Sequence, residues 1–275
     1  MRIDQLLVRR NMASTRSQAQ RLIADGVEWL QGEAWKRVAK NGDEVPDAAQ
    51  IRLLNDAQAR YVSRGGLKLE HALHAVAMDV TGMHCLDVGQ STGGFTDCLL
   101  QHGAAMVTGV DVGSAQLHPH LRTDPRVLCA ENINARNLQA EDLLEAFAAS
   151  TGEEGLFEED APVGPPADTP YATDFDLIVV DLSFISQTLV LPALIPLLKP
   201  GGTLLSLVKP QFELQPGQVG KGGIVKDATH YVFVEQRLRD ACAALGLTVT
   251  AWFDSPLQGG DGNHEFFICA RKPAA

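Results

Sequence analysis

Residues 84–95 read HCLDVGQSTGGF, a short apolar run followed by a glycine-rich loop and the start of a second apolar run. This order is typical of a β-strand that turns sharply into an α-helix. Gly89, Gly93 and Gly94 let the backbone approach a ligand closely, and a helix N-terminus offers unpaired N–H groups. A P-loop is excluded, because Phe95 stands where that motif requires Lys followed by Ser or Thr.

The segments around this loop alternate between strand-like and helix-like patterns. We expect helices at about 67–77, 95–102, 140–149 and 228–245, a further helix ending at 199–202, and strands at about 84–88, 106–112, 177–180, 203–208, 248–253 and 265–270. Apolar strands that alternate with helices are typical of a mostly parallel sheet covered on both faces. Only about a dozen residues separate the last two strands, too few for a helical crossover, so these two should pair antiparallel.

Residues 1–57 form a smaller pattern of their own. A capping box at residues 15–18 (TRSQ) begins a helix that Gly26 ends, and three strand-like runs follow at 27–30, 35–38 and 51–54. We therefore expect a compact α/β module at 1–57, a polar linker at 58–66 and the large α/β domain at 67–275.

The net charge of −11 is unevenly distributed along the 275 residues. Residues 1–60 carry ten Lys and Arg against eight Asp and Glu, whereas the remainder carries thirteen against twenty-six. Much of the acid lies in 151–174, which mixes Asp and Glu with Pro and Gly, and this composition predicts a mobile surface insertion. Contact with a polyanion is therefore expected at the basic N-terminal module, despite the acidic total.

Composition excludes several classes of protein. Apolar residues make up 45% of the chain, so a wholly disordered chain is excluded. The five Cys show no C-x-x-C spacing, which argues against a zinc site or a disulfide framework, and we expect no metal site. No signal-peptide pattern opens the chain, and the longest uncharged stretch, 182–198, is too short for a bilayer span and contains two prolines. We expect a cytoplasmic protein without membrane contact.

Two acidic residues near the glycine loop indicate the class of cofactor. Asp111 ends the next strand, twenty-two residues beyond Gly89, and an acid at that place can accept the ribose hydroxyls of an adenosine-type cofactor. Asp87 would repel the pyrophosphate of a dinucleotide but not a cationic ligand that carries an amino acid. Together, Asp87 and Asp111 favour S-adenosylmethionine over NAD as the cofactor. The alternative is that the glycine loop is only a tight turn and Asp111 only a surface residue, without a cofactor.

Four charged residues from distant parts of the chain should meet at one edge of the sheet. Asp181 and Lys209 each follow an apolar strand, Glu265 begins the antiparallel last strand, and Lys68 begins a helix after a Gly-Gly bend. Each alone also fits a surface charge. Together they suit methylation of a hydroxyl, which needs a base or an acceptor for its proton. Lys209 could be that base if the nearby charge of Lys68 lowers its pKa, although the two carboxylates would act in the opposite direction. The second contribution to the rate is the alignment of the hydroxyl oxygen with the methyl group.

Residues of about 59–270 resemble the TlyA-type members of the FtsJ-like ribose 2′-O-methyltransferases. The matching stretches are 61–69 (YVSRGGLKL), 86–95 (LDVGQSTGGF), 176–184 (DLIVVDLSF), 207–213 (LVKPQFE) and 255–266. Residues 1–57 are similar to the S-four-like RNA-binding domain, first seen in a small-subunit ribosomal protein. The matches there are 2–4 (RID), 15–16 (TR), 21–23 (RLI), 26–27 (GV) and 42–43 (GD).

The resemblance implies a class I, Rossmann-like methyltransferase fold with a seven-stranded sheet, S-adenosylmethionine as cofactor, and ribosomal RNA or ribosomal subunits as partner, with a cytidine ribose as target. The family's catalytic tetrad falls on Lys68, Asp181, Lys209 and Glu265. Cofactor contacts are expected at Asp87, Gly89, Ser91, Thr92, Gly93, Gly94, Phe95, Asp111, Val112, Asn132 and Ile133. RNA contacts are expected at Arg2, Arg9, Arg10, Arg16, Arg21 and Arg64. Two features depart from the family pattern: the insertion at 151–174, and Gln90 in place of a small residue, which should crowd or hydrogen-bond the carboxylate end of the cofactor.

Other interpretations stay open. The arginines of the module could serve only to solvate its helices, and Trp29 and Trp35 are expected to pack its small core rather than to stack on bases. His118 and His120 are expected in a surface loop. A non-catalytic RNA- or ribosome-binding factor would keep the module without methyl transfer. TlyA-type proteins have also been named hemolysins, a membrane-active function that needs an amphipathic or spanning segment, which the sequence does not offer.

Overall fold

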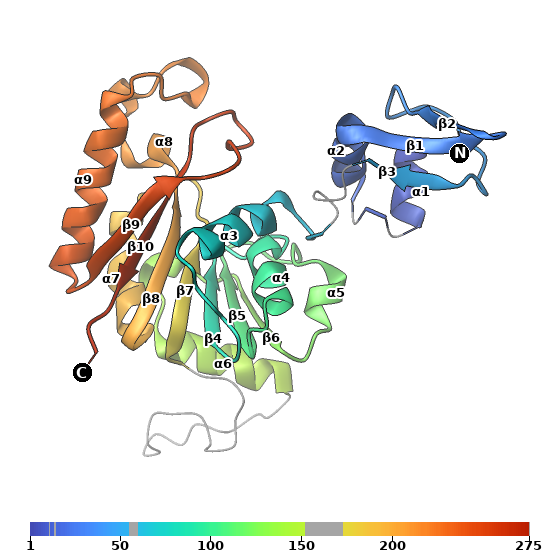
Figure 1. Cartoon of the computed structure of the whole chain (residues 1–275). Helices are drawn as coiled ribbons and strands as arrows, with labels where there is room; N and C mark the ends of the chain where they lie inside the picture. Colours follow the sequence, from blue (N-terminus) through green and yellow to red (C-terminus); the bar gives the residue numbers. More distant parts are fainter. Residues whose placement is uncertain (11, 14, 55–59, 152–172, 275) are drawn as a thin grey trace. The chain divides into compact units, whose positions relative to one another are not determined.

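The computed structural model describes residues 1–10, 12–13, 15–54, 60–151 and 173–274 (Figure 1). The chain divides into two compact units, Met1–Leu67 and Lys68–Ala275, each with its own hydrophobic core. Apart from its ends, the acidic segment expected to be a mobile insertion lies outside the described residues.

The first unit packs two helices against one face of a three-stranded antiparallel sheet. Its helices are α1 (Ile3–Arg9) and α2 (Arg16–Gly26), and its strands, in the spatial order β2-β1-β3, are β1 (Val27–Gln31), β2 (Ala34–Arg37) and β3 (Ile51–Leu53). The Thr15 side chain accepts a hydrogen bond from the Gln18 amide at 3.1 Å and so caps α2, as the sequence predicts. Leu6, Leu22 and Val27 are fully buried in the small core.

One prediction for this unit is wrong. Trp29 packs against the core, but Trp35 lies on the outside. The register explains the difference, because Trp35 pairs with Leu30 of β1, one residue out of phase with Val27 and Trp29, so its side chain points to the opposite face of the sheet.

The second unit is a seven-stranded sheet in the order β6-β5-β4-β7-β8-β10-β9, flanked by helices (Figure 1). Its strands are β4 (His84–Val88), β5 (Met106–Asp111), β6 (Val127–Glu131), β7 (Phe175–Val180), β8 (Leu198–Val208), β9 (Thr248–Asp254) and β10 (Phe266–Arg271). Its helices are α3 (Arg64–Ala75), which begins in the first unit, α4 (Gly94–Gln101), α5 (Pro119–Arg122), α6 (Ala140–Thr151), α7 (Leu191–Leu194), α8 (Pro210–Glu213) and α9 (Thr229–Ala244). All strands run parallel except β10, which is antiparallel to β8 and β9. The predicted fold class, including the antiparallel last strand, is confirmed.

Burial explains why the central strands contain almost no polar residues. Leu177, Ile178 and Val179 of β7 are completely buried, because helices cover both faces of the sheet at its centre. In β7 the polar residues come at the ends, as Asp176 and the following Asp181, whereas β5 and β8 each bury a polar residue within the strand, Thr108 and Ser206.

The helix expected to end at 199–202 is present as short helical segments that end at Leu197, and residues 199–202 belong instead to the start of strand β8. Leu198 pairs with Phe175 of β7, and the pairing resumes at Thr203 opposite Leu177 after a shift of register. The Pro-Gly-Gly sequence there resembles a helix end, but Gly201, at φ 76°, donates its amide to the backbone carbonyls of residues 272 and 273. Pairing with the neighbouring strand overrides the local signal.

Candidate active site

The glycine loop joins β4 to α4 through backbone conformations that favour glycine. Gly89 and Gly93 have φ of 88° and 90°. A Cβ atom on Gly89 would collide with the carbonyl oxygen of Asp181, and one on Gly93 would collide with the side chains of Leu117 and Leu121, which lie before and within α5. The glycines therefore allow the loop to lie against the end of β7.

A pocket of about 510 Å³ opens beside this loop. Of the predicted cofactor contacts, five line it: Gly89, Ser91, Asp111, Val112 and Ile133. The others do not: Asp87, Gly93, Gly94 and Phe95 are buried beneath the loop or in α4, and Thr92 and Asn132 are exposed outside the lining. Sequence reasoning missed several lining residues of the segments after β6 and β7, among them Arg136 and the run 182–185.

Asp111 is held in place at the end of β5 by two backbone amides. Its Oδ2 accepts a hydrogen bond from the Ser91 amide at 2.8 Å, and its Oδ1 accepts one from the Gly113 amide at 2.7 Å. Each oxygen keeps a second lone pair for a ligand hydroxyl. The carboxylate also ties the glycine loop to β5, a role that spacing alone did not reveal.

Asp87 is fully buried beneath the loop. Its Oδ2 accepts hydrogen bonds from the Thr96 amide (2.9 Å) and hydroxyl (2.7 Å), whereas its Oδ1 has no partner among the described residues. Burial raises the pKa of Asp87 to about 7, although the Thr96 hydrogen bonds oppose the rise. An unpartnered carboxyl oxygen at this place leaves room for one further donor.

Gln90 is buried and turned away from the pocket. Its amide nitrogen donates to the Thr96 hydroxyl at 3.0 Å, and its side chain covers Gly109 of β5 so closely that a Cβ there would collide with it. The side chain therefore fills space between the loop and the sheet, and its expected contact with the end of the cofactor is absent from the described pocket lining.

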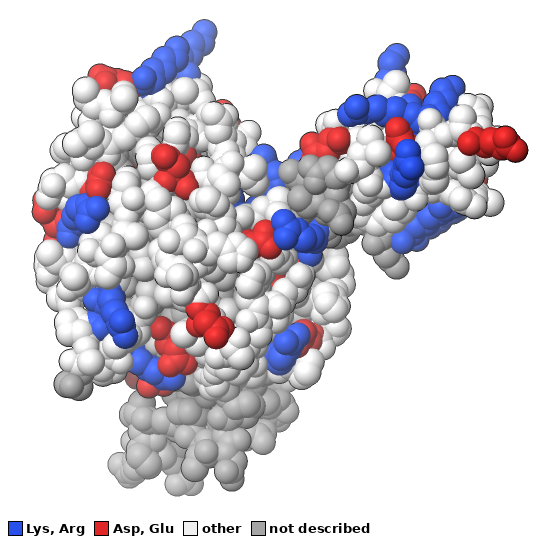
Figure 2. Space-filling model, viewed as in Figure 1, with Lys and Arg blue, Asp and Glu red and all other residues white. Residues whose placement is uncertain are grey.

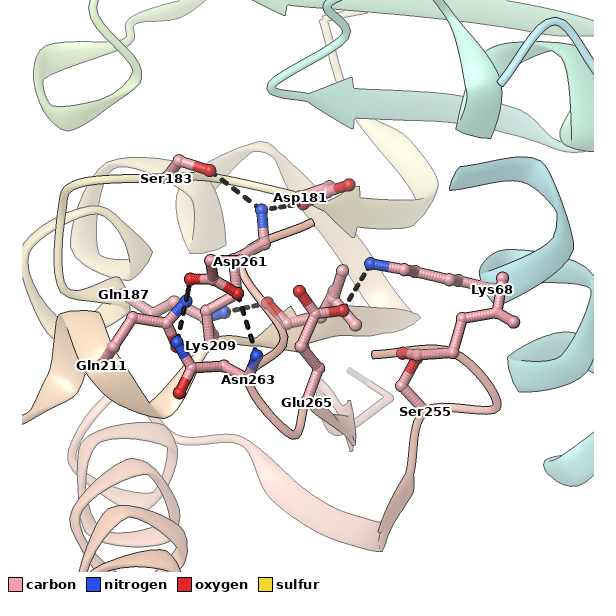
Figure 3. A network of polar contacts seen from close by, with 12 residues as sticks. Lys68, Asp181, Ser183, Gln187, Lys209, Gln211, Ser255, Asp261, Asn263 and Glu265 are labelled. Carbon is pink, nitrogen blue, oxygen red and sulfur yellow. Dashed lines mark hydrogen bonds and ion pairs between the residues drawn. The ribbon is translucent and has the colours of Figure 1, made fainter. Parts of the chain in front are cut away.

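The four residues of the predicted tetrad come together as two ion pairs (Figure 3). Lys68 pairs with Glu265, and both side chains are almost completely buried. Lys209 Nζ lies 2.5 Å from Asp181 Oδ1 and donates to the Ser183 hydroxyl at 2.9 Å.

Strand pairing explains the meeting of these residues. Val180 pairs in parallel with Val88, and Val208 pairs antiparallel with Phe266, so the residues that follow β7 and β8 and precede β10 share one edge of the sheet. Burial raises the pKa of Glu265, and the Lys68 ammonium opposes part of this rise. Asp181 also lines the pocket, so the charged cluster borders the space beside the glycine loop.

A second layer of polar contacts supports the tetrad, and the sequence analysis did not single it out. The buried Glu213 accepts hydrogen bonds from the Ser186 hydroxyl (2.5 Å) and the Gln187 backbone amide (2.7 Å). These hydrogen bonds connect the segment after Asp181 to the segment after Lys209. The signal in the sequence that could have identified Glu213 is its place in the motif 207–213.

Beside Glu265, Asp261 accepts hydrogen bonds from the side chains of Gln211 (2.9 Å) and Asn263 (2.8 Å) (Figure 3). This contact links the loop before β10 to α8, which begins directly after Lys209. The loop that leads to Glu265 and the helix that follows Lys209 are thus connected through polar side chains, of which Asn263 is buried and Asp261 is exposed.

Phe184 is a further residue that the sequence analysis did not assign. It is 91% exposed, lies in a left-handed backbone conformation (φ 66°) and lines the pocket. Its ring contacts that of Phe212 at a centroid distance of 5.1 Å. Phe184 follows Asp181 by three residues and Phe212 follows Lys209 by three residues. This repeated spacing was the signal in the sequence that could have identified them.

The arginines of the first unit make contacts within the unit. Arg2 and Arg16 both pair with the buried Asp4, at 3.0 and 2.9 Å, and the Arg2 hydrogen bond lowers the pKa of Asp4 to about 2. Arg9 pairs with Asp47, and Arg10 donates to the carbonyls of residues 47 and 49.

These arginines stay accessible while they support the fold. About half of each of the Arg2, Arg9 and Arg16 side chains is exposed: 45%, 49% and 55%. Arg21 is half-buried, and its Nε has no partner in the described part of the chain. Burial, followed by the nearby charge of Arg64, lowers the pKa of Arg21.

No described helix is long and apolar enough to span a membrane. No cluster of three or more His, Cys, Asp or Glu side chains suited to a metal ion occurs in the described ranges. His118 and His120 lie at the start of the short helix α5.

The comparisons with known proteins agree with this geometry. The FtsJ-like methyltransferase family matches residues 61–272, and the S4 domain matches residues 1–26. The chain is 39% identical to the 16S/23S rRNA (cytidine-2′-O)-methyltransferase TlyA of Mycobacterium tuberculosis, over 98% of this chain and 89% of the relative. It is 34% identical to the protein named Hemolysin A of Brachyspira hyodysenteriae, over 97% of this chain and 98% of the relative.

A solved structure from Streptococcus thermophilus, which also carries a hemolysin name, superimposes with a TM-score of 0.69 at 35% identity and covers 99% of this chain and 88% of its own. The hemolysin names and the methyltransferase names thus occur among relatives of similar identity. The chain belongs to the FtsJ-like methyltransferase family, among its TlyA-type members.

Proposed function

We propose that this protein transfers a methyl group from S-adenosylmethionine to the 2′-hydroxyl of a cytidine ribose in ribosomal RNA. The observation that carries the proposal is the pair of ion pairs, Lys68 with Glu265 and Lys209 with Asp181, at the border of the pocket. The relative from Mycobacterium tuberculosis is named for this reaction on 16S and 23S rRNA.

The pocket residues fit S-adenosylmethionine. Asp111 suits the ribose hydroxyls, because its carboxylate is fixed by backbone amides and faces the pocket. Val112 and Ile133 supply apolar surface for the adenine ring. The unpartnered Asp87 Oδ1 beneath the loop suits the cationic amino-acid end, held directly or through water.

When bound, the cofactor supplies an electrophilic methyl group on a sulfonium. The protein's own part is to hold the ribose hydroxyl and to receive its proton, for which the Asp181 carboxylate in the pocket lining is the acceptor. Lys209 donates one N–H group to the Ser183 hydroxyl and lies in an ion pair with Asp181, and a further N–H group can hold the ribose oxygen. The carboxylates of Asp181 and Glu265 fix both lysines, so the cluster is organised before the substrate arrives.

Phe184 is proposed to receive the base of the target nucleotide. A ribose hydroxyl inside folded RNA reaches a pocket only when its nucleotide leaves the stack, and the exposed base then needs an aromatic surface. The exposed Phe184 ring at the pocket supplies that surface, and Phe184 and Phe212 both line a neighbouring pocket of about 460 Å³, with Arg136 and Arg237 also in its lining.

We assign RNA binding to residues 1–57, the linker to 58–66 and methyl transfer to 67–275. The S4 match at residues 1–26 and the exposed arginines of α1 and α2 support the first assignment. A non-catalytic RNA-binding factor remains the second candidate, but it would have no need for the buried tetrad.

The test is methyl transfer itself. The protein is incubated with S-adenosylmethionine labelled in the methyl group and with small and large ribosomal subunits separately, and the modified nucleotide is then mapped. We expect the label in the ribose of a cytidine. Label on a base, or RNA binding without any label, would contradict the proposal.

A further inference from the structure

The outer face of the first unit's sheet carries an exposed aromatic ring among arginines. Trp35 pairs with Leu30 of β1, and Arg37 and Arg52 both pair with Glu28 of β1. Paired residues of antiparallel strands share a face, so these side chains point away from the core and from the helices. In Figure 2, Lys and Arg side chains gather on this unit where Figure 1 draws β1 and β2.

The Trp35 ring is held in place by Arg52 and remains partly exposed. The Arg52 guanidinium lies 4.3 Å from the centre of the Trp35 ring, and Glu28 fixes this guanidinium through contacts of 2.7 and 2.6 Å. Trp35 is still 36% exposed, and every residue of β2, an edge strand, is exposed. A large apolar ring kept at the surface by a fixed guanidinium favours a ligand with a flat face.

The charges around the ring favour an anionic ligand. Glu28 is engaged by Arg52, which leaves Arg37 of β2 as a second cation on this face, with Glu33 in the preceding turn as the nearby acid. A single ring offers too little apolar area for a stable protein interface. An unpaired nucleotide combines a flat base with a phosphate and matches both features.

We propose that this sheet face binds an unpaired nucleotide of the RNA, with its base stacked against the Trp35–Arg52 pair and its phosphate beside Arg37. The inference rests on the proposed function, because it takes RNA as the substrate. The site is separate from the arginines of α1 and α2, because both helices pack on the other face of the sheet. The Trp35 site would recognise unpaired nucleotides, whereas the arginines of α1 and α2 would contact backbone phosphates.

The test compares Trp35→Leu and Trp35→Tyr in the full-length protein, with Phe233→Leu as control. Phe233 is a 50% exposed aromatic residue of α9 that has no role in the proposal. The probes are an RNA hairpin with an unpaired loop and a fully paired duplex of the same stem. We expect Trp35→Leu to weaken hairpin binding about tenfold, as loss of one stacked base would, while Trp35→Tyr and Phe233→Leu bind the hairpin as the wild type does. Duplex binding should stay unchanged in all variants.

A second measurement uses the unmodified protein. Hairpin RNA with a photoreactive uridine in its loop is cross-linked to the protein, and the attached peptide is identified. A cross-link at β2 supports the site, and cross-links confined to other segments contradict it. Equal hairpin affinity of Trp35→Leu and wild type, or an equal loss on duplex and hairpin, would overturn the inference.

A methyl-transfer assay distinguishes a failure of the sheet-face site from a failure of the proposed function. Wild-type protein that methylates ribosomal RNA while Trp35→Leu keeps full hairpin affinity overturns the sheet-face site alone. Wild-type protein that binds the hairpin through Trp35 but methylates no ribosomal subunit overturns the proposed function alone.

Discussion

At the scale of single residues, Lys209 is the side chain on which the chemistry depends most. It is outside the pocket lining but joined to Asp181, which lines it. We expect Lys209→Ala to lower the rate of methyl transfer at least about 100-fold, because the ribose hydroxyl loses the group that holds it, and to leave cofactor affinity within about twofold. Single-turnover rates and calorimetry measure the two quantities.

Lys199 provides the matched control for this prediction. It lies at the opposite end of the same strand, β8, in an ion pair with Asp176 at 3.0 Å. Lys199→Ala should keep normal turnover. Similar rates for Lys209→Ala and Lys199→Ala would remove Lys209 from the mechanism.

Asp111 should determine cofactor affinity. Asp111→Ala removes the acceptor for ribose hydroxyls and frees the Ser91 and Gly113 amides. We expect affinity for S-adenosylmethionine to fall at least about tenfold, since a lost charged hydrogen bond costs about 1.5–3 kcal/mol. Calorimetry that returned wild-type affinity would refute the placement of the adenosyl group.

Asp87 should make stability depend on pH. Its pKa rises from 3.8 to about 7 on folding, so between these values the folded protein holds a proton that the unfolded chain has lost. This contribution is fully present below about pH 4 and is lost as the pH rises towards about 7. Asp87→Asn does not titrate, so the unfolding free energy of the wild type relative to this variant should fall across that window in cofactor-free protein. Denaturant unfolding at several pH values measures it, and parallel curves for the two proteins would contradict the burial of a neutral Asp87.

At the scale of elements, the glycine loop and β5 fit together through one glycine. Gly109 has ordinary backbone angles, and only the Gln90 side chain lying over it excludes a larger residue. Gly109→Ala should therefore lower the unfolding free energy by about 1–3 kcal/mol through overpacking. Adding Gln90→Ala should recover part of this loss, because the clash disappears. Thermal unfolding of the single and double variants gives the coupling, and strictly additive effects would show that the two positions do not meet.

At the scale of the whole molecule, the two units have separate cores and separate proposed tasks. Deleting residues 1–57 should lower RNA affinity and flatten its dependence on salt, because the arginines of α1 and α2 are removed. Affinity for S-adenosylmethionine should change little, since every residue of its pocket lies in the second unit. An RNA titration unchanged by the deletion would move the RNA-binding task away from the first unit.

The sequence was sufficient to predict most of the strands and helices in their order, the antiparallel last strand and the family, but not strand β6. Each of these depends on local or strictly periodic signals: apolar runs, turn glycines and short motifs whose order is specific. The common edge reached by Asp181, Lys209 and Glu265 followed from the same signals, because strand direction alone decides which end of a strand faces a site.

Contacts that depend on register and on the path of loops required the folded structure. The pairing of Lys68 with Glu265 and of Lys209 with Asp181, the turn of Gln90 over Gly109, and the exposure of Trp35 and Phe184 follow from which residues stand opposite one another. A shift of one residue along a strand would exchange its faces without changing its composition. Residue type and spacing therefore define the chemistry available to this protein, and three-dimensional packing selects which groups act together.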